Sequence, residues 1–210
     1  MLTLTDILQL NRIIPIIVID RVEHAIPLAN RLVNSGFTVL EITLRSSCAL
    51  KAIKQIVDEV PKAIVGAGTI INPQQLSQAK EAGAKFAVSP GLSKQLISEA
   101  KKQNLIYLPG IATPSEALLA YELDVTHLKF FPAESMGGIK TLSAISEVLP
   151  LYFCPTGGVN LDNLISYLSL PCVSCIGGTW IAPRSLIQAN AFDEIAQRAK
   201  KAQNLLKKLH

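Results

Sequence analysis

The sequence predicts an α/β protein: a single (β/α)₈ TIM barrel with a short N-terminal helix, occupying residues 1–210 as one domain. Eight short apolar runs, bounded by turn residues, recur at intervals of 20 to 25 residues from one start to the next. Segments with helical spacing lie between these runs. Because no linker or change in composition interrupts the series, we expect eight parallel strands, each followed by a helix that covers the outer face of the sheet.

The strands are predicted from their apolar character and their steady spacing. In order they are IIPIIVID from Ile14, TVLEITL from Thr38, AIVGAGT from Ala63, FAVSPG from Phe86, IYLPGIA from Ile106, HLKFFPA from His127, YFCPTGG from Tyr152 and VSCIGG from Val173. Nearly continuous apolar runs of this length are typical of parallel strands that are buried on both faces.

The helices are predicted from helical periodicity between residues that start and end a helix. Five segments show it clearly: residues 23–36, 48–60, 73–84, 93–104 and 114–123. Residues suited to an N-cap or first turn are Asn72 with Pro73, Ser93, Thr113 with Pro114, and Asn160. Gly36 and Gly83 are placed to end helices. The C-terminal stretch is amphipathic, and we expect a solvated helix face to carry its basic residues, Arg198, Lys200, Lys201, Lys207 and Lys208.

An open doubly wound sheet is the main alternative to the barrel. Its usual signature is a G-x-G-x-x-G turn after the first strand, followed about twenty residues later by an acidic residue. That signature is missing, because GAGTII at 66–71 lacks the third glycine and follows the third strand, and GGIKT at 137–141 lacks the spacing of a phosphate loop. The barrel is therefore the favoured architecture.

The amino-acid composition limits which partners and which cellular location are expected. Hydrophobic residues make up 49% of the chain and charged residues 17%, and the net charge is only +4, which favours a compact protein without nucleic-acid or membrane partners. The first six residues lack a secretory signal, and no apolar run reaches the ~18 residues of a membrane helix. A cytoplasmic protein is expected, whose four cysteines, Cys48, Cys154, Cys172 and Cys175, are free thiols. Because the C-x-x-C of Cys172 and Cys175 lies inside a predicted strand without a second pair, we expect neither zinc nor redox chemistry there.

Lys129 is the first candidate for chemistry, because the active site of a (β/α)₈ barrel is built at the carboxyl ends of its strands. It lies in HLKFFPAE, where alternation puts it on the same face as Phe131 and opposite Leu128 and Phe130. A lysine among aromatic rings loses hydration of its ammonium group, and the free amine that results is able to attack a carbonyl. Schiff-base chemistry is one interpretation, and a lysine that snorkels or pairs with a carboxylate is the other.

Glu41, Thr43 and Arg45 share one face of the second predicted strand by the same alternation. Three polar residues on a buried face are costly unless they bind one another or a ligand. Glu41 is suited to proton transfer, and Arg45 to binding a carboxylate through two parallel hydrogen bonds. A structural ion pair of Glu41 with Arg45 or with Lys129 is the alternative.

Glycine pairs end the last two predicted strands: Gly157-Gly158, and Gly177-Gly178 followed by Thr179. Glycine lets the backbone approach an anion closely, and the loops after the seventh and eighth strands are the usual phosphate site of this architecture. We therefore expect a phosphate between the two pairs, unless the glycines only form tight turns.

Seven segments together carry a resemblance to a known family. They are VLEITLRSSCALKAI, AIVGAGTIINPQQL, FAVSPGL, LPGIATPSE, KFFPAE, FCPTGGV and CIGGTW. From about Ile14 to Ala196 the chain resembles the bifunctional 2-keto-3-deoxy-6-phosphogluconate (KDPG) and 4-hydroxy-2-oxoglutarate (KHG) aldolases. The departures are small: Met136 stands where a smaller or polar residue is expected, and the N-terminal helix is short.

The resemblance implies a metal-free Schiff-base aldolase that cleaves KDPG to pyruvate and glyceraldehyde 3-phosphate, and KHG to pyruvate and glyoxylate. It implies Lys129 as the Schiff-base lysine and Glu41 as the proton-transferring carboxylate. The implied substrate-binding residues are Arg45 and Thr69 for the pyruvate carboxylate, Pro90 and Phe131 for the apolar wall, Thr156 beside the imine, and Gly158, Gly178 and Thr179 near the phosphate. It also implies a homotrimer without a cofactor, in the Entner-Doudoroff pathway of carbohydrate metabolism.

Two other functions fit the same residues. One is a phosphate-handling isomerase or epimerase, in which Glu41 is a base and Lys129 an electrostatic aid. The other is a barrel without catalytic activity that binds a sugar phosphate as a sensor. The histidines His24, His127 and His210 are expected on a helix, at the start of a strand and at the terminus, too scattered to share a metal ion. The sequence leaves open the preferred aldehyde and the configuration at C4.

Overall fold

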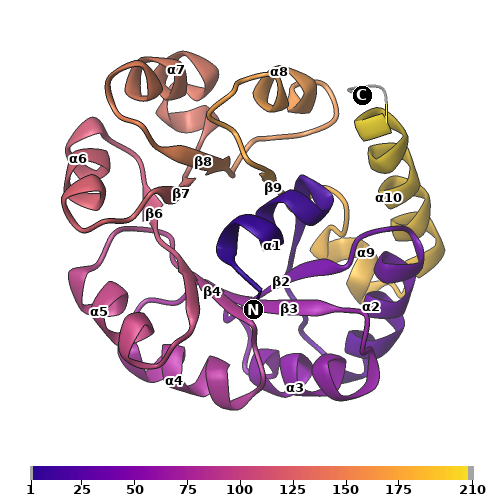
Figure 1. The fold of residues 1–210 in the computed structure, drawn as a ribbon. Coiled ribbons are helices and arrows are strands. Elements are labelled where there is room, and N and C mark those ends of the chain that lie inside the picture. Colours follow the sequence, from indigo (N-terminus) through magenta and orange to yellow (C-terminus); the bar gives the residue numbers. More distant parts are fainter. Residues whose placement is uncertain (1, 208–210) are drawn as a thin grey trace.

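Parallel strands surrounded by helices make up the computed structural model, which describes residues 2–207 (Figure 1). Lys208 and His210, named above, lie outside these residues. The strands are β1 (Ile13–Ile17), β2 (Val39–Thr43), β3 (Ile64–Gly68), β4 (Phe86–Val88), β5 (Ile106–Leu108), β6 (Gly110–Ile111), β7 (His127–Phe130), β8 (Tyr152–Pro155) and β9 (Ile176–Gly178). They form a six-stranded sheet of order β5-β4-β3-β2-β1-β9 and a three-stranded sheet of order β6-β7-β8, and every pair is parallel. The predicted α/β class with parallel strands is confirmed.

The first seam between the two sheets lies at Pro109, where the sequence predicts one continuous strand and the structure has β5 and β6. Proline has no N–H group for the ladder, so pairing is interrupted at this residue. Its carbonyl still accepts a hydrogen bond of 2.8 Å from the backbone N–H of Lys129 in β7.

The second seam lies between β8 and β9, which are joined by two isolated parallel bridges, Phe153 to Val173 and Thr156 to Gly177. The last strand begins at Ile176, three residues after the predicted start at Val173, and Val173 contributes only a bridge. The structure thus has parallel sheets that meet at two seams, while the fully closed eight-stranded barrel stays a prediction.

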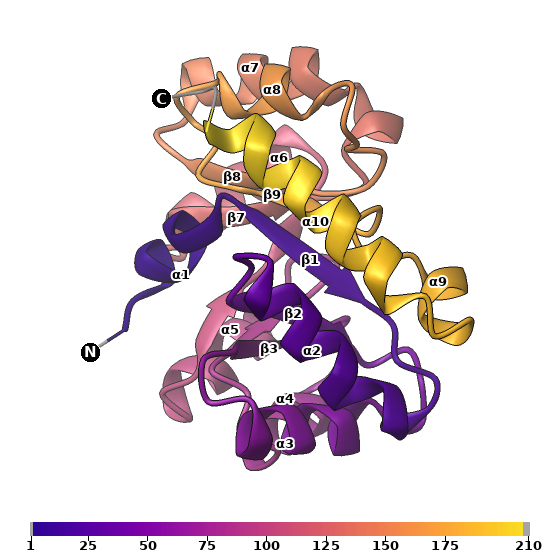
Figure 2. The same ribbon diagram turned by 90° about the vertical axis from the view of Figure 1, so that its right-hand side faces the viewer.

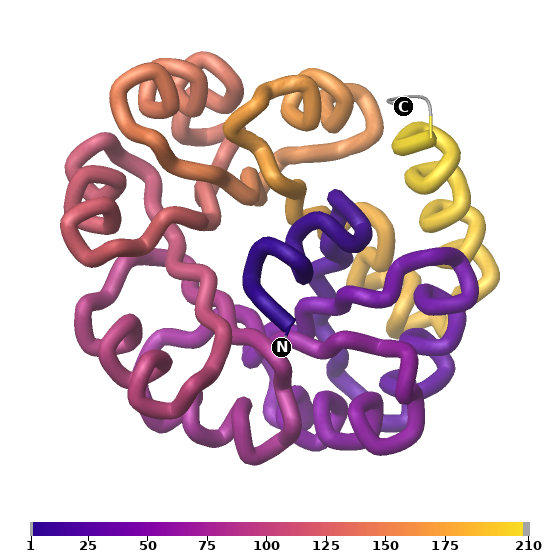
Figure 3. Tube along the Cα trace, viewed as in Figure 1, coloured from indigo at the N-terminus to yellow at the C-terminus, as the bar shows by residue number. Residues whose placement is uncertain are grey.

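Ten α-helices and two short 3₁₀ turns are described in residues 2–207. They are α1 (Leu4–Asn11), η1 (Val22–His24), α2 (Ala25–Asn34), α3 (Ala49–Glu59), α4 (Pro73–Glu81), α5 (Lys94–Lys102), α6 (Pro114–Glu122), η2 (Glu134–Met136), α7 (Gly138–Val148), α8 (Leu164–Leu168), α9 (Arg184–Gln188) and α10 (Phe192–Leu206). Helices α2 to α8 and α10 surround the strands, and α1 lies across one end of them (Figures 1 and 3). The short N-terminal helix is therefore confirmed, and none of the described helices is long and apolar enough to cross a membrane.

Local signals explain where several of these helices begin and end. Three predicted N-cap side chains accept a hydrogen bond from a backbone N–H of the first turn: Asn72, Ser93 and Thr113. Gly36 and Gly83 follow α2 and α4 with a φ of 93°, the left-handed conformation that ends a helix. The expectation for Asn160 is wrong, because α8 begins only at Leu164 and the Asn160 side chain accepts from Asp162 in the turn before it.

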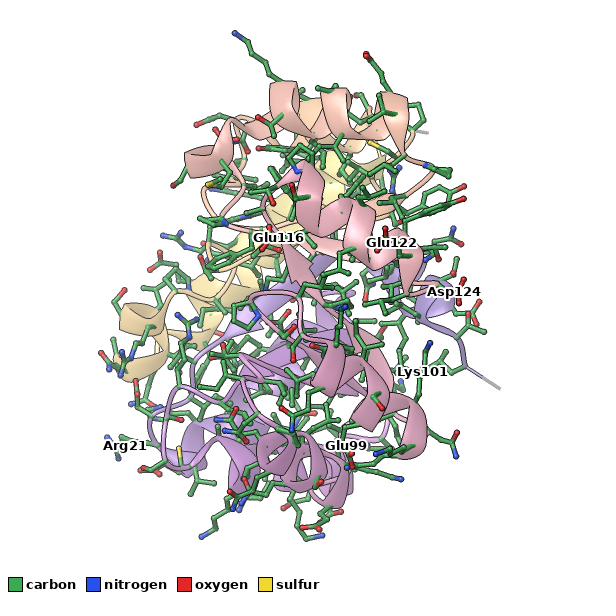
Figure 4. The ribbon with its side chains drawn as sticks, turned by 90° about the vertical axis from the view of Figure 1, so that its left-hand side faces the viewer. Arg21, Glu99, Lys101, Glu116, Glu122 and Asp124 are labelled. Carbon is green, nitrogen blue, oxygen red and sulfur yellow. The ribbon has the colours of Figure 1, made fainter. Side chains whose placement is uncertain are left out.

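The apolar core has two parts, which lie in different places relative to the strands. The larger part lies between the sheets and the helices around them, and the smaller one joins α1 to side chains of β1, β2, β4 and β5, among them Ile14, Val39 and Phe86. Figure 2 shows β1 running from the end that α1 covers toward the end where α9 lies. Charged side chains such as Lys101 and Glu122 lie on the outer surface of α5 and α6 (Figure 4).

Candidate active site

Nine of the ten predicted site residues line one cavity of about 270 Å³ at the carboxyl ends of the strands. Its lining is Ile16, Glu41, Thr43, Arg45, Thr69, Pro90, Lys129, Phe131, Thr156, Gly157, Gly158, Val159, Gly177 and Thr179. The tenth predicted residue, Gly178, is not part of the wall. The carboxyl ends of parallel strands meet at the same edge, which explains why residues as far apart in the sequence as Ile16 and Thr179 share this cavity.

Lys129 is the third residue of β7, and its side chain is only 8% exposed. The alternation predicted from the sequence holds, because the Lys129 Nζ lies 5.5 Å from the centre of the Phe131 ring, over its face. The fully buried Phe130 packs in the larger part of the core, between strands and helices. The Lys129 side chain therefore lies on the face of β7 opposite the helices, with its amine at the cavity.

Glu41 faces Lys129 across this cavity from β2, and Lys129 Nζ lies 3.4 Å from Glu41 Oε1. The Glu41 side chain is 6% exposed, so the amine and the carboxylate are both largely withdrawn from water. Burying two such charges costs several kcal/mol per ion, which their attraction offsets only when they are in contact. Geometry of this kind places a base within reach of any group that is bound to the lysine.

Room for the Glu41 carboxylate is made by Gly68 on the neighbouring strand β3. A Cβ added at Gly68 would lie 2.1 Å from Glu41 Oε1, closer than any nonbonded contact allows. Gly66, two residues earlier on the same face, makes room for the Phe86 ring in the same way. The GAG of the third strand, which the sequence analysis treated as an incomplete nucleotide-binding signature, is thus explained by packing against these two side chains.

Arg45 and Thr69 lie at the rim of the cavity. Arg45 donates from Nε to Thr43 Oγ1 over 3.2 Å, and Thr43 in turn donates to the carbonyl of Ile17 over 3.0 Å. No carboxylate in residues 2–207 lies within ion-pair distance of Arg45, so its terminal nitrogens have no protein counter-ion there. Thr69 has a φ of 62°, a strained conformation for a β-branched residue and one that is concentrated at functional sites.

Thr156, Gly157 and Gly158 form the wall after β8. The carbonyls of Thr156 and Gly157 accept hydrogen bonds from the backbone N–H groups of Ala133 and Glu134, over 2.8 and 3.0 Å. Because the C=O and N–H of a trans peptide point in opposite directions, the N–H groups of Gly157 and Gly158 point away from that segment. Neither of them finds an acceptor within the described part of the chain.

The wall at β9 is formed by Gly177 and Thr179, and Gly178 faces away from the cavity. A Cβ added at Gly177 would meet Thr156 Oγ1 at 2.3 Å and Ile16 at 2.7 Å, whereas one at Gly178 would meet the ring of Trp180 at 2.7 Å. Gly177, and not Gly178, is therefore part of the cavity wall, as period-2 alternation from Thr179 would predict. The expected place of Gly178 near the phosphate stays a prediction. Ile16 and Val159 were also missed, because an apolar wall residue has the same sequence pattern as a core residue.

A larger cavity, of about 720 Å³, lies at the other end of the strands. Its wall includes Thr5 and Arg12 from the N-terminal segment, His127 and Tyr152 at the starts of β7 and β8, and Lys207. Size alone would favour it as the active site. It contains no buried pair of a nucleophile and a carboxylate, so we assign the chemistry to the smaller cavity around Lys129.

The two histidines of the described residues, His24 and His127, are not part of the cavity around Lys129. His24 is buried at the end of η1, and His127 begins β7, where it stacks on Tyr152 with ring centres 5.1 Å apart. Burial lowers the pKa of His127. Within residues 2–207 no three His, Cys, Asp or Glu side chains are grouped so that they could hold a metal ion.

Comparison with known proteins shows the family of this chain. The model of the family described as KDPG and KHG aldolase matches residues 4–198. The chain is 47% identical over 198 residues to the KHG/KDPG aldolase of Escherichia coli (strain K12), covering 94% of this chain and 93% of the relative. The structure resembles that of the KDPG aldolase of Legionella pneumophila with pyruvate captured at low pH as a covalent carbinolamine intermediate, with a TM-score of 0.92, 40% identity, and coverage of 94% of this chain and 97% of the other. It also resembles the 2-keto-3-deoxy-6-phosphogluconate aldolase of Zymomonas mobilis ZM4 with 3-phosphoglycerate, with a TM-score of 0.88, 41% identity, and coverage of 94% and 93%.

Proposed function

This chain belongs to the KDPG and KHG aldolase family, and from that premise we propose that it is a Schiff-base aldolase. It cleaves 2-dehydro-3-deoxy-6-phosphogluconate to pyruvate and glyceraldehyde 3-phosphate, and 4-hydroxy-2-oxoglutarate to pyruvate and glyoxylate. The observation that carries the assignment to particular residues is the buried contact of 3.4 Å between Lys129 Nζ and Glu41 Oε1.

In the proposed mechanism, the neutral amine of Lys129 adds to the C2 carbonyl of the substrate, and loss of water gives a protonated imine. Glu41 takes the proton of the C4 hydroxyl, the bond between C3 and C4 breaks, and its electron pair moves toward the imine nitrogen. The aldehyde leaves, the enamine is protonated at C3 to the imine of pyruvate, and water releases pyruvate from Lys129. The imine nitrogen is the electron acceptor in this sequence, so the reaction proceeds without a metal ion.

The remaining residues bind the two ends of the substrate. Arg45, with no protein counter-ion in the described residues, is proposed to bind the pyruvate carboxylate, together with Thr69. The free N–H groups of Gly157 and Gly158 are proposed to bind the phosphate, with Thr179 beside them. Pro90, Phe131 and Thr156 complete the wall around the imine.

Borohydride reduction in the presence of pyruvate tests the proposal. A Schiff-base aldolase gains a stable pyruvyl adduct that is visible by mass spectrometry of the intact protein. An isomerase or epimerase that uses Lys129 only electrostatically gains none, and neither does a barrel that only binds a sugar phosphate. Absence of the adduct in a protein that binds pyruvate would therefore overturn the assignment.

We also propose that the two sheets close into one barrel of eight strands. Support comes from the continuous chain through Pro109 at one seam and from the two bridges between β8 and β9 at the other. Counted in this way, β5 and β6 are one strand, and the eight units of the sequence pattern correspond to eight strands. The homotrimer implied by the resemblance and the cytoplasmic location expected from the sequence are further parts of this proposal.

A further inference from the structure

The phosphate loop proposed above, residues 156–158, depends on a segment that the mechanism does not use. The turn after β7 packs behind the loop, and the backbone N–H groups of Ala133 and Glu134 bind its first two carbonyls. Gly158 is bound from the same outer side, because its carbonyl accepts from the side chains of Asn160 and Asn163, each over 3.2 Å. All three carbonyls of the loop are therefore engaged by protein, while the N–H groups of Gly157 and Gly158 point away from the turn after β7. The third N–H group of the loop, that of Thr156, donates to the carbonyl of Phe130 over 2.9 Å.

The Glu134 side chain lies directly against this loop. A Cβ added at Gly158 would be 2.5 Å from Glu134 Cγ and 2.6 Å from Glu134 Cβ, so the aliphatic part of the glutamate fills the place of a Gly158 side chain. Gly158 has a φ of 84°, in the left-handed region that favours glycine. Glu134 thus contacts the loop twice, through its backbone N–H and through its side chain.

The far end of Glu134 is fixed by Tyr167 of α8. The Tyr167 hydroxyl donates to Glu134 Oε1, and the tyrosine is fully buried. Burial and the negative charge of Glu134 raise the pKa of Tyr167, so the hydroxyl stays a donor across the physiological range. Oε1 also lies 2.9 Å from where a Cβ of Gly138 would be, and Gly138, at the start of α7, has a φ of 56°, which favours glycine. The carboxylate therefore lies toward α7 and α8, outside the wall of the cavity.

We propose that Glu134 and Tyr167 are positioning residues for the phosphorylated end of the substrate: they hold the loop of residues 156–158 so that the N–H groups of Gly157 and Gly158 point at the phosphate. This inference rests on the proposed function, since it takes the phosphate to bind at Gly157 and Gly158. Neither residue lines the cavity, so both act through the loop. Their loss should therefore affect substrates with a phosphate and spare those without one.

The test compares cleavage of KDPG, which has a phosphate, with cleavage of KHG, which has none. Tyr167→Phe removes only the hydroxyl, and Glu134→Ala removes both the contact with Gly158 and the acceptor. For each we expect kcat/KM for KDPG to fall about tenfold, mainly through KM, and the inhibition constant of inorganic phosphate to rise by about the same factor, the usual effect of losing a hydrogen bond to a charged group. For KHG we expect less than about a twofold change.

Two further variants separate positioning from stability. Glu134→Gln keeps the side-chain length and an oxygen that accepts from Tyr167, so it should restore kcat/KM for KDPG to within about threefold of the wild type. Tyr107→Phe is the matched control, because it also removes a tyrosine hydroxyl that donates to a side chain, here Ser89 Oγ over 2.6 Å at a half-buried position. It should not discriminate between the substrates. Equal losses with KDPG and KHG in the Tyr167 and Glu134 variants, or no loss with either, would overturn the proposal, as would a Glu134→Gln variant as impaired as Glu134→Ala.

The pyruvyl adduct of the wild type is the separate check on the proposed function. Its absence would contradict the aldolase activity and would leave the role of the loop to be judged from the variants.

Discussion

At the scale of single residues, the burial of Lys129 and Glu41 is difficult to explain by stability. Both side chains are less than 10% exposed, at 8% and 6%, and an apolar pair of similar volume would be at least as stable in that place. Chemistry explains the pair better. An amine beside a carboxylate can lose its proton to that neighbour, and the carboxylate remains close when the amine has become an imine.

Lys129 is expected to be the one lysine that is trapped by borohydride with pyruvate. It is the buried lysine of the described chain, whereas others, such as Lys101 and Lys140, are exposed on helices and stay fully hydrated. Peptide mapping of the reduced protein checks the position of the adduct, with Lys129→Arg as a control that keeps the positive charge but forms no imine. Recovery of the pyruvyl group on another lysine would contradict the assignment.

Glu41→Gln is expected to preserve the pyruvyl adduct and to lower kcat for aldol cleavage by roughly 10²–10⁴-fold, the usual contribution of a positioned acid or base. The amide fills the same space next to Gly68 but cannot take the proton of the C4 hydroxyl. The pyruvyl adduct should therefore still be detected by mass spectrometry while turnover of KDPG is strongly reduced. Near-normal turnover would show that Glu41 is only the ion-pair partner of Lys129.

At the scale of elements, the site depends on the register of β2 against β3. Thr43 is the partner of Gly68 and Glu41 that of Gly66, so the inner face of β3 is left without side chains where Glu41 and Phe86 need space. A single-residue slip of β3 would bring Ala67 to that face, and a slip of β2 would instead turn Glu41 to the helices. Register, more than any one contact, places the carboxylate at the lysine.

Gly68→Ala tests this dependence on β3. The new methyl group would lie 2.1 Å from Glu41 Oε1, so the carboxylate must move, and we expect kcat/KM to fall by about 10²-fold, the usual effect of a 1 Å displacement at an active site. Gly91→Ala is the matched control, because a Cβ there meets nothing within 4 Å. Steady-state kinetics and thermal melts of both variants make the comparison. Equal activity in the two would mean that Glu41 does not need its observed position.

At the scale of the whole molecule, the two ends of the strands have different tasks. The end that α1 covers has the smaller apolar part of the core beneath that helix, with the larger cavity beside it, and the opposite end collects the polar residues of the site. His127 lies at the first end, where it contacts Thr5 and Tyr152. Its protonation therefore bears on stability and not directly on the chemistry at Lys129.

The stability of the protein should decrease in mild acid, and His127 should contribute to that decrease. Burial lowers its pKa in the folded protein below the ordinary value of 6.5, so the unfolded chain binds a proton at a higher pH than the folded one. The contribution is fully present above pH 6.5 and is lost as the pH falls through the lower, folded pKa. Denaturant unfolding at about pH 7.5 and about pH 5.5 should show a larger loss of unfolding free energy for the wild type than for His127→Gln. Equal losses of unfolding free energy in the two proteins would mean that groups other than His127 cause the decrease in acid.

The sequence by itself determined the α/β class, the parallel strands, the caps of α4, α5 and α6, and most of the cavity wall. It could do so because apolar periodicity, capping residues and period-2 alternation are local properties, and because Lys129 and Glu41 are polar residues inside apolar strands, where burial needs a reason. The resemblance to the aldolases added the roles of residues such as Thr69 and Pro90.

Only the tertiary structure decided how Lys129 and Glu41 meet, which glycine faces the cavity, and what holds the loop of residues 156–158. The contact of 3.4 Å across 88 positions depends on the register and packing of separate strands, which no local pattern encodes. Gly177 and Gly178 are chemically identical, and they differ only in the direction in which a Cβ would point, which is set by the pairing of β9 with β1. A Cβ would point into the cavity wall at Gly177 and toward Trp180 at Gly178. The bond between Tyr167 and Glu134 joins two segments 33 residues apart. Its effect on the loop depends on the direction of the carbonyls of Thr156 and Gly157, which only the folded backbone determines.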